Sequence, residues 1–247
     1  MASASSTRLG TVLFRLRSFT PVPVILLLAY QLWRSRGGPG PGGAELDSLL
    51  NWVGLAVALA GQGLRFYTLG QVPEGTSGQD NFLQARSLNT RGPYAHVRNP
   101  LYVGKLGIIL GLLLIANDPW VSLLGLGFFF GQYFFIIRAE EAFLEGQHGE
   151  AYREFLAKVP RWVPRLTPAF PGRLRASFDY ARGLKKGHNP FAAWALGALV
   201  LSYWELHARG ALSPVRFNVL VGLAVTVVLA FGLIKAWKRR WLFASRA

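Results

Sequence analysis

The sequence predicts an all-α fold, a polytopic membrane helix bundle of about six transmembrane helices forming a single domain over residues 1–247. Hydrophobic residues make up 51% of the chain, and the charged residues, 16%, gather between long apolar runs. This distribution is typical of polytopic membrane proteins. Helices are the expected form because their backbone hydrogen bonds close within each segment, as a lipid environment requires.

Six apolar segments carry this prediction. Most reach the length of about 17 to 25 residues that a helix needs to cross the hydrocarbon core, and the first and fifth are short. We expect transmembrane helices at residues 18–33, 48–70, 100–117, 120–137, 190–207 and 214–235.

The distribution of Lys and Arg predicts that both termini lie on the cytoplasmic side. With this orientation most of the 27 basic residues flank the spans on the cytoplasmic side, and the opposite side holds Arg34, Arg36, Arg209 and Arg216. Basic residues favour the cytoplasmic side of a membrane. Topology therefore explains the net charge of +15 better than nucleic-acid binding, for which no recognition module is present.

The composition also excludes several kinds of site. The chain has no cysteine, which rules out disulfides, thiolate metal sites and a cysteine nucleophile. The four histidines show no metal-ligand spacing, so we expect no metal centre.

The stretch from Gly92 to Pro164 places polar residues at both ends of a hydrophobic hairpin. The turn Asn117-Asp118-Pro119 joins the third and fourth spans, so both polar ends return to the cytoplasmic face. After the fourth span we expect a cytoplasmic amphipathic helix, which Pro160 ends. Its apolar stripe has the spacing i, i+3, i+4 and i+7, at Tyr152, Phe155, Leu156 and Val159.

Some residues of this stretch have an ordinary structural explanation. Asn99 is a good helix N-cap and Pro100 suits the first helical position, so this pair would begin the third span in any protein. Arg65 and Lys105 lie near cytoplasmic helix ends, where basic side chains reach the interface; we favour this explanation for Lys105 and leave Arg65 open.

Glu140 and Glu141 are harder to explain structurally. A carboxylate at the membrane boundary is costly unless it meets water, a cation or a hydrogen-bond donor. An Arg138–Glu141 pair on an exposed helix would contribute only about 0.2 to 0.5 kcal/mol and would leave Glu140 on another face. The two acids therefore favour a functional site.

The combination of motifs resembles a known superfamily. The run GPYAHVRNPLYVG at 92–104, the acid pair and the run YREFLAKVPRWVP at 152–164 resemble the integral-membrane methyltransferases, which include isoprenylcysteine carboxyl methyltransferases and phospholipid N-methyltransferases. Upstream, Gly63-Leu64-Arg65 and Leu69-Gly70 extend the likeness, which covers roughly residues 54–166.

The resemblance implies a cofactor core at residues 92–166 that binds S-adenosylmethionine at the cytoplasmic helix ends. It implies catalytic roles for Arg161, His96 and Glu141. The chain departs from the common pattern at Asn99, where histidine is usual, at Phe155 and at His148. The cofactor-binding residues that the resemblance implies are His96, Val97, Arg98, Pro100, Tyr102, Gly104, Glu140 and Glu141.

The donor's chemistry suits these residue types. Carboxylates can hold its cationic and hydroxyl groups, and an arginine can hold its carboxylate. We therefore expect a membrane methyltransferase with a lipidic or amphiphilic acceptor, with carboxyl O-methylation of an isoprenylcysteine-like substrate and N-methylation of a phospholipid both open. An amine acceptor would need a base such as His96 or a glutamate. The alternatives are an NADPH-dependent sterol-type reductase and a non-catalytic membrane protein.

Overall fold

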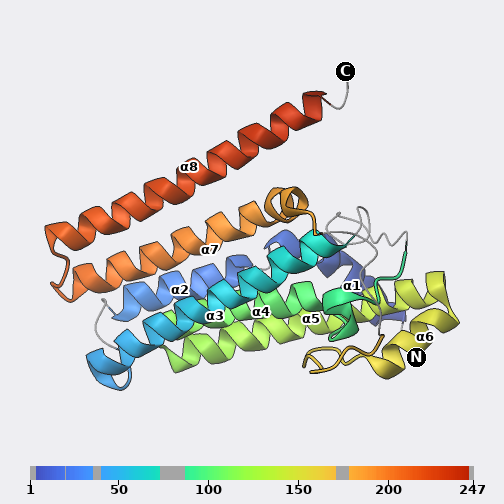
Figure 1. Ribbon diagram of the computed structural model, residues 1–247. Helices are drawn as coiled ribbons and strands as arrows, with labels where there is room; N and C mark the ends of the chain where they lie inside the picture. The colour runs from blue at the N-terminus through green and yellow to red at the C-terminus, as the bar shows by residue number, and fades with distance from the viewer. Residues whose placement is uncertain (1–3, 20, 36–39, 73–86, 171–177, 245–247) are drawn as a thin grey trace.

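The computed structural model describes residues 4–19, 21–35, 40–72, 87–170 and 178–244, and over these residues every element is a helix. The predicted all-α fold is confirmed. Figure 1 shows the longer helices running along one common direction, with the α4–α5 turn at one end and α6 at the other. Both chain ends lie toward the α6 end in this view. The elements are α1 (Ala4–Arg15), η1 (Arg17–Phe19), α2 (Pro21–Ser35), α3 (Gly43–Gln71), η2 (Gly92–Ala95), α4 (Pro100–Ala116), α5 (Pro119–His148), α6 (Glu150–Lys158), α7 (Tyr180–Ala208) and α8 (Pro214–Ala244).

Helices α2, α3, α4, α5, α7 and α8 lie over the six predicted ranges, and several are longer than predicted. Within the described part of the chain, three helices are long and apolar enough to cross a membrane: α3, α5 and the part of α8 at Pro214–Arg239. The bent pair Arg8–Arg15 and Arg17–Arg34, with an angle of 60°, would make a fourth span, and Pro100–Ala116 is a shorter apolar helix. That six helices cross the membrane stays a prediction.

The polar segment before the fifth range does not match its predicted structure. Residues 161–189 are basic and rich in proline and glycine early on, which predicts a connector, whereas α7 begins at Tyr180 and continues through Pro190. The Asp179 side chain accepts a hydrogen bond of 2.9 Å from the backbone N–H of Arg182, which caps the helix ten residues before the apolar run. A proline inside a long helix is tolerated where neighbouring helices support it.

Glycines bring α3 and α4 into close contact. A Cβ atom at Gly61 would lie 2.5 Å from the carbonyl oxygen of Gly104, and one at Gly111 would lie 2.4 Å from the carbonyl oxygen of Gly54. Such distances leave no room for any side chain. Small residues allow helix backbones to approach in membranes, where van der Waals packing drives association.

Polar contacts hold the end of the bundle that carries the α4–α5 turn. Asp47 of α3 pairs with Arg209 at the end of α7 and accepts a hydrogen bond from Asn117. Asp118, which caps α5, pairs with Arg34 of α2. These contacts fix the helix ends farthest from the predicted site.

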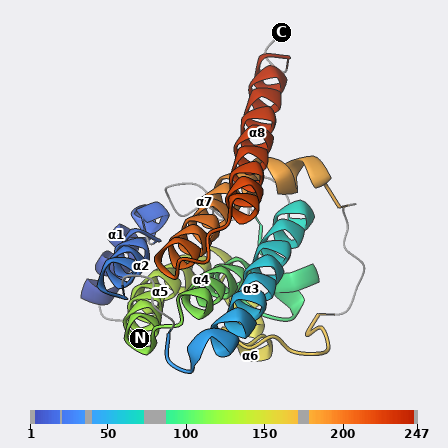
Figure 2. The same ribbon diagram turned by 90° about the vertical axis from the view of Figure 1, so that its left-hand side faces the viewer.

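The predicted amphipathic helix is confirmed as α6. Tyr152, Phe155 and Val159 are buried and form a small core of their own, against which Leu88, Leu144, Leu156, Ala169 and Phe170 pack. Unlike α6, α8 is not enclosed by the rest of the chain. Figure 2 shows that it stands away from the bundle, and it packs mainly on α7.

We predict that Gly61→Ala lowers the free energy of unfolding by about 1 to 3 kcal/mol, because its Cβ would overlap the α4 backbone. Thermal unfolding of the purified protein in detergent measures the change. Gly63→Ala is the matched control, since nothing lies within 4 Å of a Cβ there, and alanine favours the helix. Equal stability of the two variants would contradict this close approach of α3 and α4.

Candidate functional site

The sequence run at 92–104 meets the run at 152–164 and the residues that follow it through backbone hydrogen bonds. Arg98 donates its N–H to the carbonyl of Pro160 at 2.8 Å, Arg165 donates to the carbonyl of His96 at 2.9 Å, and Ala169 donates to the carbonyl of Ala95 at 2.8 Å. The loop before α4 and the loop after α6 are thereby held side by side. This pairing places both loops at the same end of the hairpin.

Glu141 lies at the centre of an ion-pair cluster at this end. Its carboxylate accepts from Arg98 Nη1 at 2.9 Å and from Arg161 Nε and Nη2 at 3.1 and 2.6 Å. The Glu141 side chain is 15% exposed, so it is largely shielded from water. The Arg138–Glu141 pair that the sequence offered as an ordinary explanation is not formed, because Arg138 lies over the Phe134 ring at 5.0 Å.

Glu140 faces a different partner from its neighbour. Its Oε1 accepts a hydrogen bond of 2.8 Å from the hydroxyl of Tyr102. Tyr94 lies nearby in η2, where burial raises the pKa of its hydroxyl well above the ordinary value, and the charge of Glu140 raises this pKa further. Tyr94 therefore stays a neutral hydrogen-bond donor at physiological pH.

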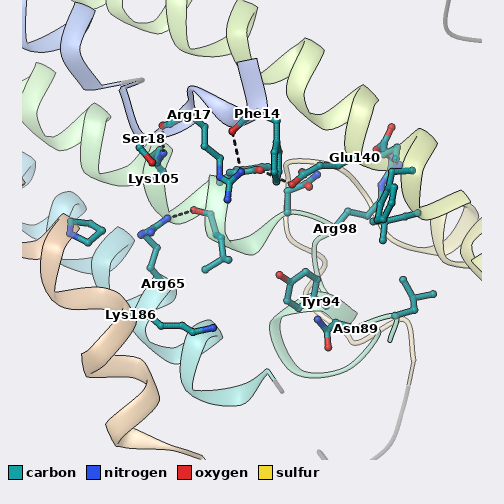
Figure 3. Close-up of a pocket in the computed structure, with 18 of the residues that line it drawn as sticks. Phe14, Arg17, Ser18, Arg65, Asn89, Tyr94, Arg98, Lys105, Glu140 and Lys186 are labelled. Atoms are coloured by element: carbon teal, nitrogen blue, oxygen red, sulfur yellow. Dashed lines mark hydrogen bonds and ion pairs between the residues drawn. The ribbon is translucent and has the colours of Figure 1, made fainter. Parts of the chain in front are cut away.

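A cavity of about 550 Å³ opens between these groups (Figure 3). It draws residues from the N-terminal helices, α3, α4, α5, α6, α7 and the loops before α4. Five cationic and two anionic side chains line it, together with three tyrosines and an apolar wall. The charged and tyrosine residues are Arg17, Arg65, Arg98, Lys105, Lys186, Glu140, Glu141, Tyr94, Tyr102 and Tyr152.

Arg65 and Lys105 both line this cavity. Arg65 is buried, at 7% exposure, and donates from Nη1 to the carbonyl of Leu101 at 2.9 Å. Lys105 Nζ donates to the carbonyl of Arg17 at 3.4 Å. The cavity thus provides Lys105 with a polar environment inside the bundle, and its contact with the membrane surface stays a prediction.

The predicted site residues divide into two groups. Arg98, Tyr102, Glu140 and Glu141 line the cavity. The others lie around it as structural support: His96 binds the carbonyl of Arg165 through Nδ1 at 2.8 Å, Val97 and Pro100 are buried, and Gly104 contacts α3. Arg161 reaches the site through Glu141.

Asn99 and Pro100 begin α4 as predicted, but the Asn99 side chain has an additional role. It stands at the N-cap position before Pro100 but forms no capping hydrogen bond through its side chain. Its amide donates instead to the carbonyl of Arg161 at 3.3 Å, and it lines the cavity. The asparagine at this position, where histidine is usual, thus links the loop before α4 to the loop after α6.

Several cavity residues lie outside the sequence pattern. In the sequence, Arg17 and Lys186 only supported the predicted topology, and Asn89 belonged to no motif. No local motif marks them. Arg17 reaches the cavity from η1, Lys186 from α7 and Asn89 from the loop before η2, so tertiary packing brings them together.

The comparisons with known proteins agree with this arrangement. Residues 49–151 match the family model described as phospholipid methyltransferase. This match agrees with the resemblance that the sequence runs carry, to a superfamily that includes phospholipid N-methyltransferases. No curated protein and no solved structure matches the chain.

We predict that Glu141→Gln lowers the free energy of unfolding by about 2 kcal/mol, because Arg98 and Arg161 lose the charge that compensates them in a shielded place. Thermal unfolding in detergent measures this. Glu145→Gln, one turn along the same helix, is the control, because its pair with Arg153 is exposed on both sides and contributes little to stability. The ion-pair cluster would not be a structural centre if both variants unfolded at the same temperature.

Proposed function

We propose that the protein is an S-adenosylmethionine-dependent membrane methyltransferase that acts on a lipidic or amphiphilic acceptor. The observation that carries this proposal is the cavity, in which Arg98, Tyr102, Glu140 and Glu141 from the segment matching the phospholipid methyltransferase family meet. The matched segment supports a methyltransferase activity, and the cavity could hold the two reactants.

The cavity fits the methyl donor in size and chemistry. Its volume of about 550 Å³ lies within the range of small-molecule sites, about 300 to 1,000 Å³. Glu140 suits the donor's ammonium or ribose hydroxyls, and Tyr94 and Tyr102 present aromatic rings to a sulfonium. Arg98 has a buried Nε with no hydrogen-bond partner among the described residues, which suits an anionic group such as the donor's carboxylate.

The donor would supply an electrophilic methyl group on a sulfonium sulfur. The protein's own contribution is to hold both reactants in line and to exclude water, which accounts for large rate accelerations without a covalent enzyme intermediate. Glu141, fixed by two arginines, holds the loops at 92–99 and 160–169 around the cavity. We assign Arg161 and His96 to positioning, since each contacts a loop or Glu141 rather than the cavity.

The acceptor would enter from the membrane. Apolar residues of the cavity wall come from the N-terminal helices, with Phe14 and Pro21, and from α7, with Pro190 and Ala193. A cavity with such a wall suits an acyl or prenyl chain. The orientation that places this end in the cytoplasm rests on the basic residues that flank the helices.

Titration with S-adenosylhomocysteine tests the proposal directly. Because a ligand that binds the native state raises its stability, we expect this compound at 100 times its Kd to raise the free energy of unfolding by about 2.7 kcal/mol. NADPH, added to a parallel sample, is expected to leave the unfolding temperature unchanged. Stabilisation by NADPH alone would instead support a reductase.

We predict that Glu140→Gln weakens binding of S-adenosylhomocysteine at least tenfold, about 1.4 kcal/mol, because the neutral amide loses a charge-assisted hydrogen bond. Isothermal titration calorimetry of the purified protein measures the affinity. Glu145→Gln removes an acid from the exposed part of the same helix and should bind as the wild type does. Unchanged affinity in Glu140→Gln would remove Glu140 from the donor site.

A further inference from the structure

The loop after α6, residues 160–170, exposes two large aliphatic side chains. Leu166 is 99% exposed and Val163 is 76% exposed, so the rest of the described chain leaves both uncovered. The loop is nevertheless tied down, because Arg161 pairs with Glu141 and the loop backbone binds the loop before α4. A fixed loop that exposes apolar side chains indicates an apolar partner outside the chain.

Trp162 shows where this loop lies along the bundle. Its ring packs on α5, with centroid distances of 6.1 Å to Phe129 and 5.5 Å to Phe130. The preceding residue, Arg161, contacts Glu141, which lies about 16 Å farther along α5 than Phe130 at a rise of 1.5 Å per residue. The two neighbouring side chains therefore point in opposite directions along α5. Figure 1 shows the loop folding back beside α5, away from α6.

Arg138 marks the membrane boundary on this side of α5. Residues 119–137 of the helix carry no charged side chain, and the Arg138 guanidinium lies over the Phe134 ring at 5.0 Å. A basic side chain packed on an apolar ring at the end of such a run lies at the headgroup level. Phe130 and Phe134, one turn apart, are 43% and 46% exposed and so face the acyl chains. The Trp162 ring, in contact with Phe130, thus lies on the membrane side of Arg138.

The composition of the loop suits the membrane interface. Pro160, Pro164 and Pro168 have no backbone N–H, so they leave no donor unpaired where water is scarce. Tryptophan is enriched at the interface, where its ring meets lipid and its indole N–H meets polar groups. Arg165 donates from Nη1 to the carbonyl of Lys158 at 2.7 Å, which directs its charge toward α6.

We propose that the loop at 160–170 is embedded in the membrane interface at the α6 end of the bundle. Val163 and Leu166 contact the acyl chains of that leaflet, and Trp162 anchors the loop to α5. The partner is the lipid bilayer, because the exposed side chains continue the lipid-facing surface of α5 that the loop meets at Trp162. This inference goes beyond the proposed function, since it concerns the surroundings of the loop and holds for any ligand of the cavity.

An embedded loop connects the membrane to the ion-pair cluster. Arg161, directly before Trp162, pairs with Glu141, and its carbonyl accepts a hydrogen bond from the Asn99 amide at 3.3 Å. The bilayer therefore helps to hold the loop that positions these groups. The sequence predicts a cytoplasmic connector over the same residues, which would place the loop in water.

Site-directed spin labelling of the full chain in phosphatidylcholine nanodiscs tests the proposal. The chain has no cysteine, so one introduced thiol carries the only label. Leu166→Cys and Val163→Cys are compared with two references. Glu150→Cys on α6, where the side chain is 86% exposed, is the water reference, and Leu124→Cys on α5, at 55% exposure, is the lipid reference. Power saturation measures how often each label collides with oxygen, which is enriched in lipid, and with nickel ethylenediaminediacetate, which stays in water.

We expect both loop labels to resemble the lipid reference. Their accessibility to the nickel complex should be at least about threefold below that of the label at Glu150, because a polar complex is excluded from the acyl-chain region. Equal accessibility of the loop labels and the Glu150 label to the nickel complex would overturn the proposal and place the loop in water. Low accessibility to both reagents would also overturn it, since a protein surface, such as a second copy of the chain, would then cover the loop.

Trp162→Ala tests the anchor in the same experiment. Accessibility of the label at Leu166 to the nickel complex should rise about threefold in this background, because the loop loses its aromatic packing on α5. Trp120→Ala is the matched control, since it removes a tryptophan that is 70% exposed at the other end of α5. It should leave the label unchanged. An unchanged label in Trp162→Ala would remove the anchoring role. No cofactor is added, so failure of the proposed function would not alter these results.

Discussion

The ion-pair cluster around Glu141 is the interaction on which the arrangement of the site depends. One carboxylate on α5 holds Arg98 from the loop before α4 and Arg161 from the loop after α6. Backbone hydrogen bonds between the same loops reinforce it. Because the cluster is largely shielded from water, its electrostatic attraction is stronger than that of a surface pair. Glu140, next along the helix, is thereby presented to the cavity with Tyr102.

The membrane helices provide the frame for this cluster. The glycine contacts of α3 and α4 bring Arg65 and Lys105 within one region, since each helix approaches the other without intervening side chains. Polar contacts of Asp47 and Asp118 fix the far end of the bundle. A rigid frame of this kind lets loops form a site whose charged groups are held by partners on different helices.

The sequence predicted the parts that local chemistry determines. Apolar length located the helices, Tyr152, Phe155 and Val159 had the spacing of a buried stripe, and the motifs selected Arg98, Tyr102 and the two acids. It did not predict what depends on tertiary packing. Whether Glu141 pairs with Arg138 or with distant arginines follows from how the loops fold back, and a basic residue such as Lys105 reads as interfacial until a cavity is known. The early start of α7 was missed because a polar run hides the Asp179 cap.

The origin of the cavity wall also has a consequence for biogenesis. Phe14 and Arg17 leave the ribosome before the hairpin, whereas Lys186 and Ala193 follow only after the whole hairpin has been made. The cavity is therefore completed late, when α7 packs against the helices made before it. Until then, the cavity lacks its α7 wall. The N-terminal helices and α7 must both pack against the α4–α5 hairpin before the cavity can enclose a ligand.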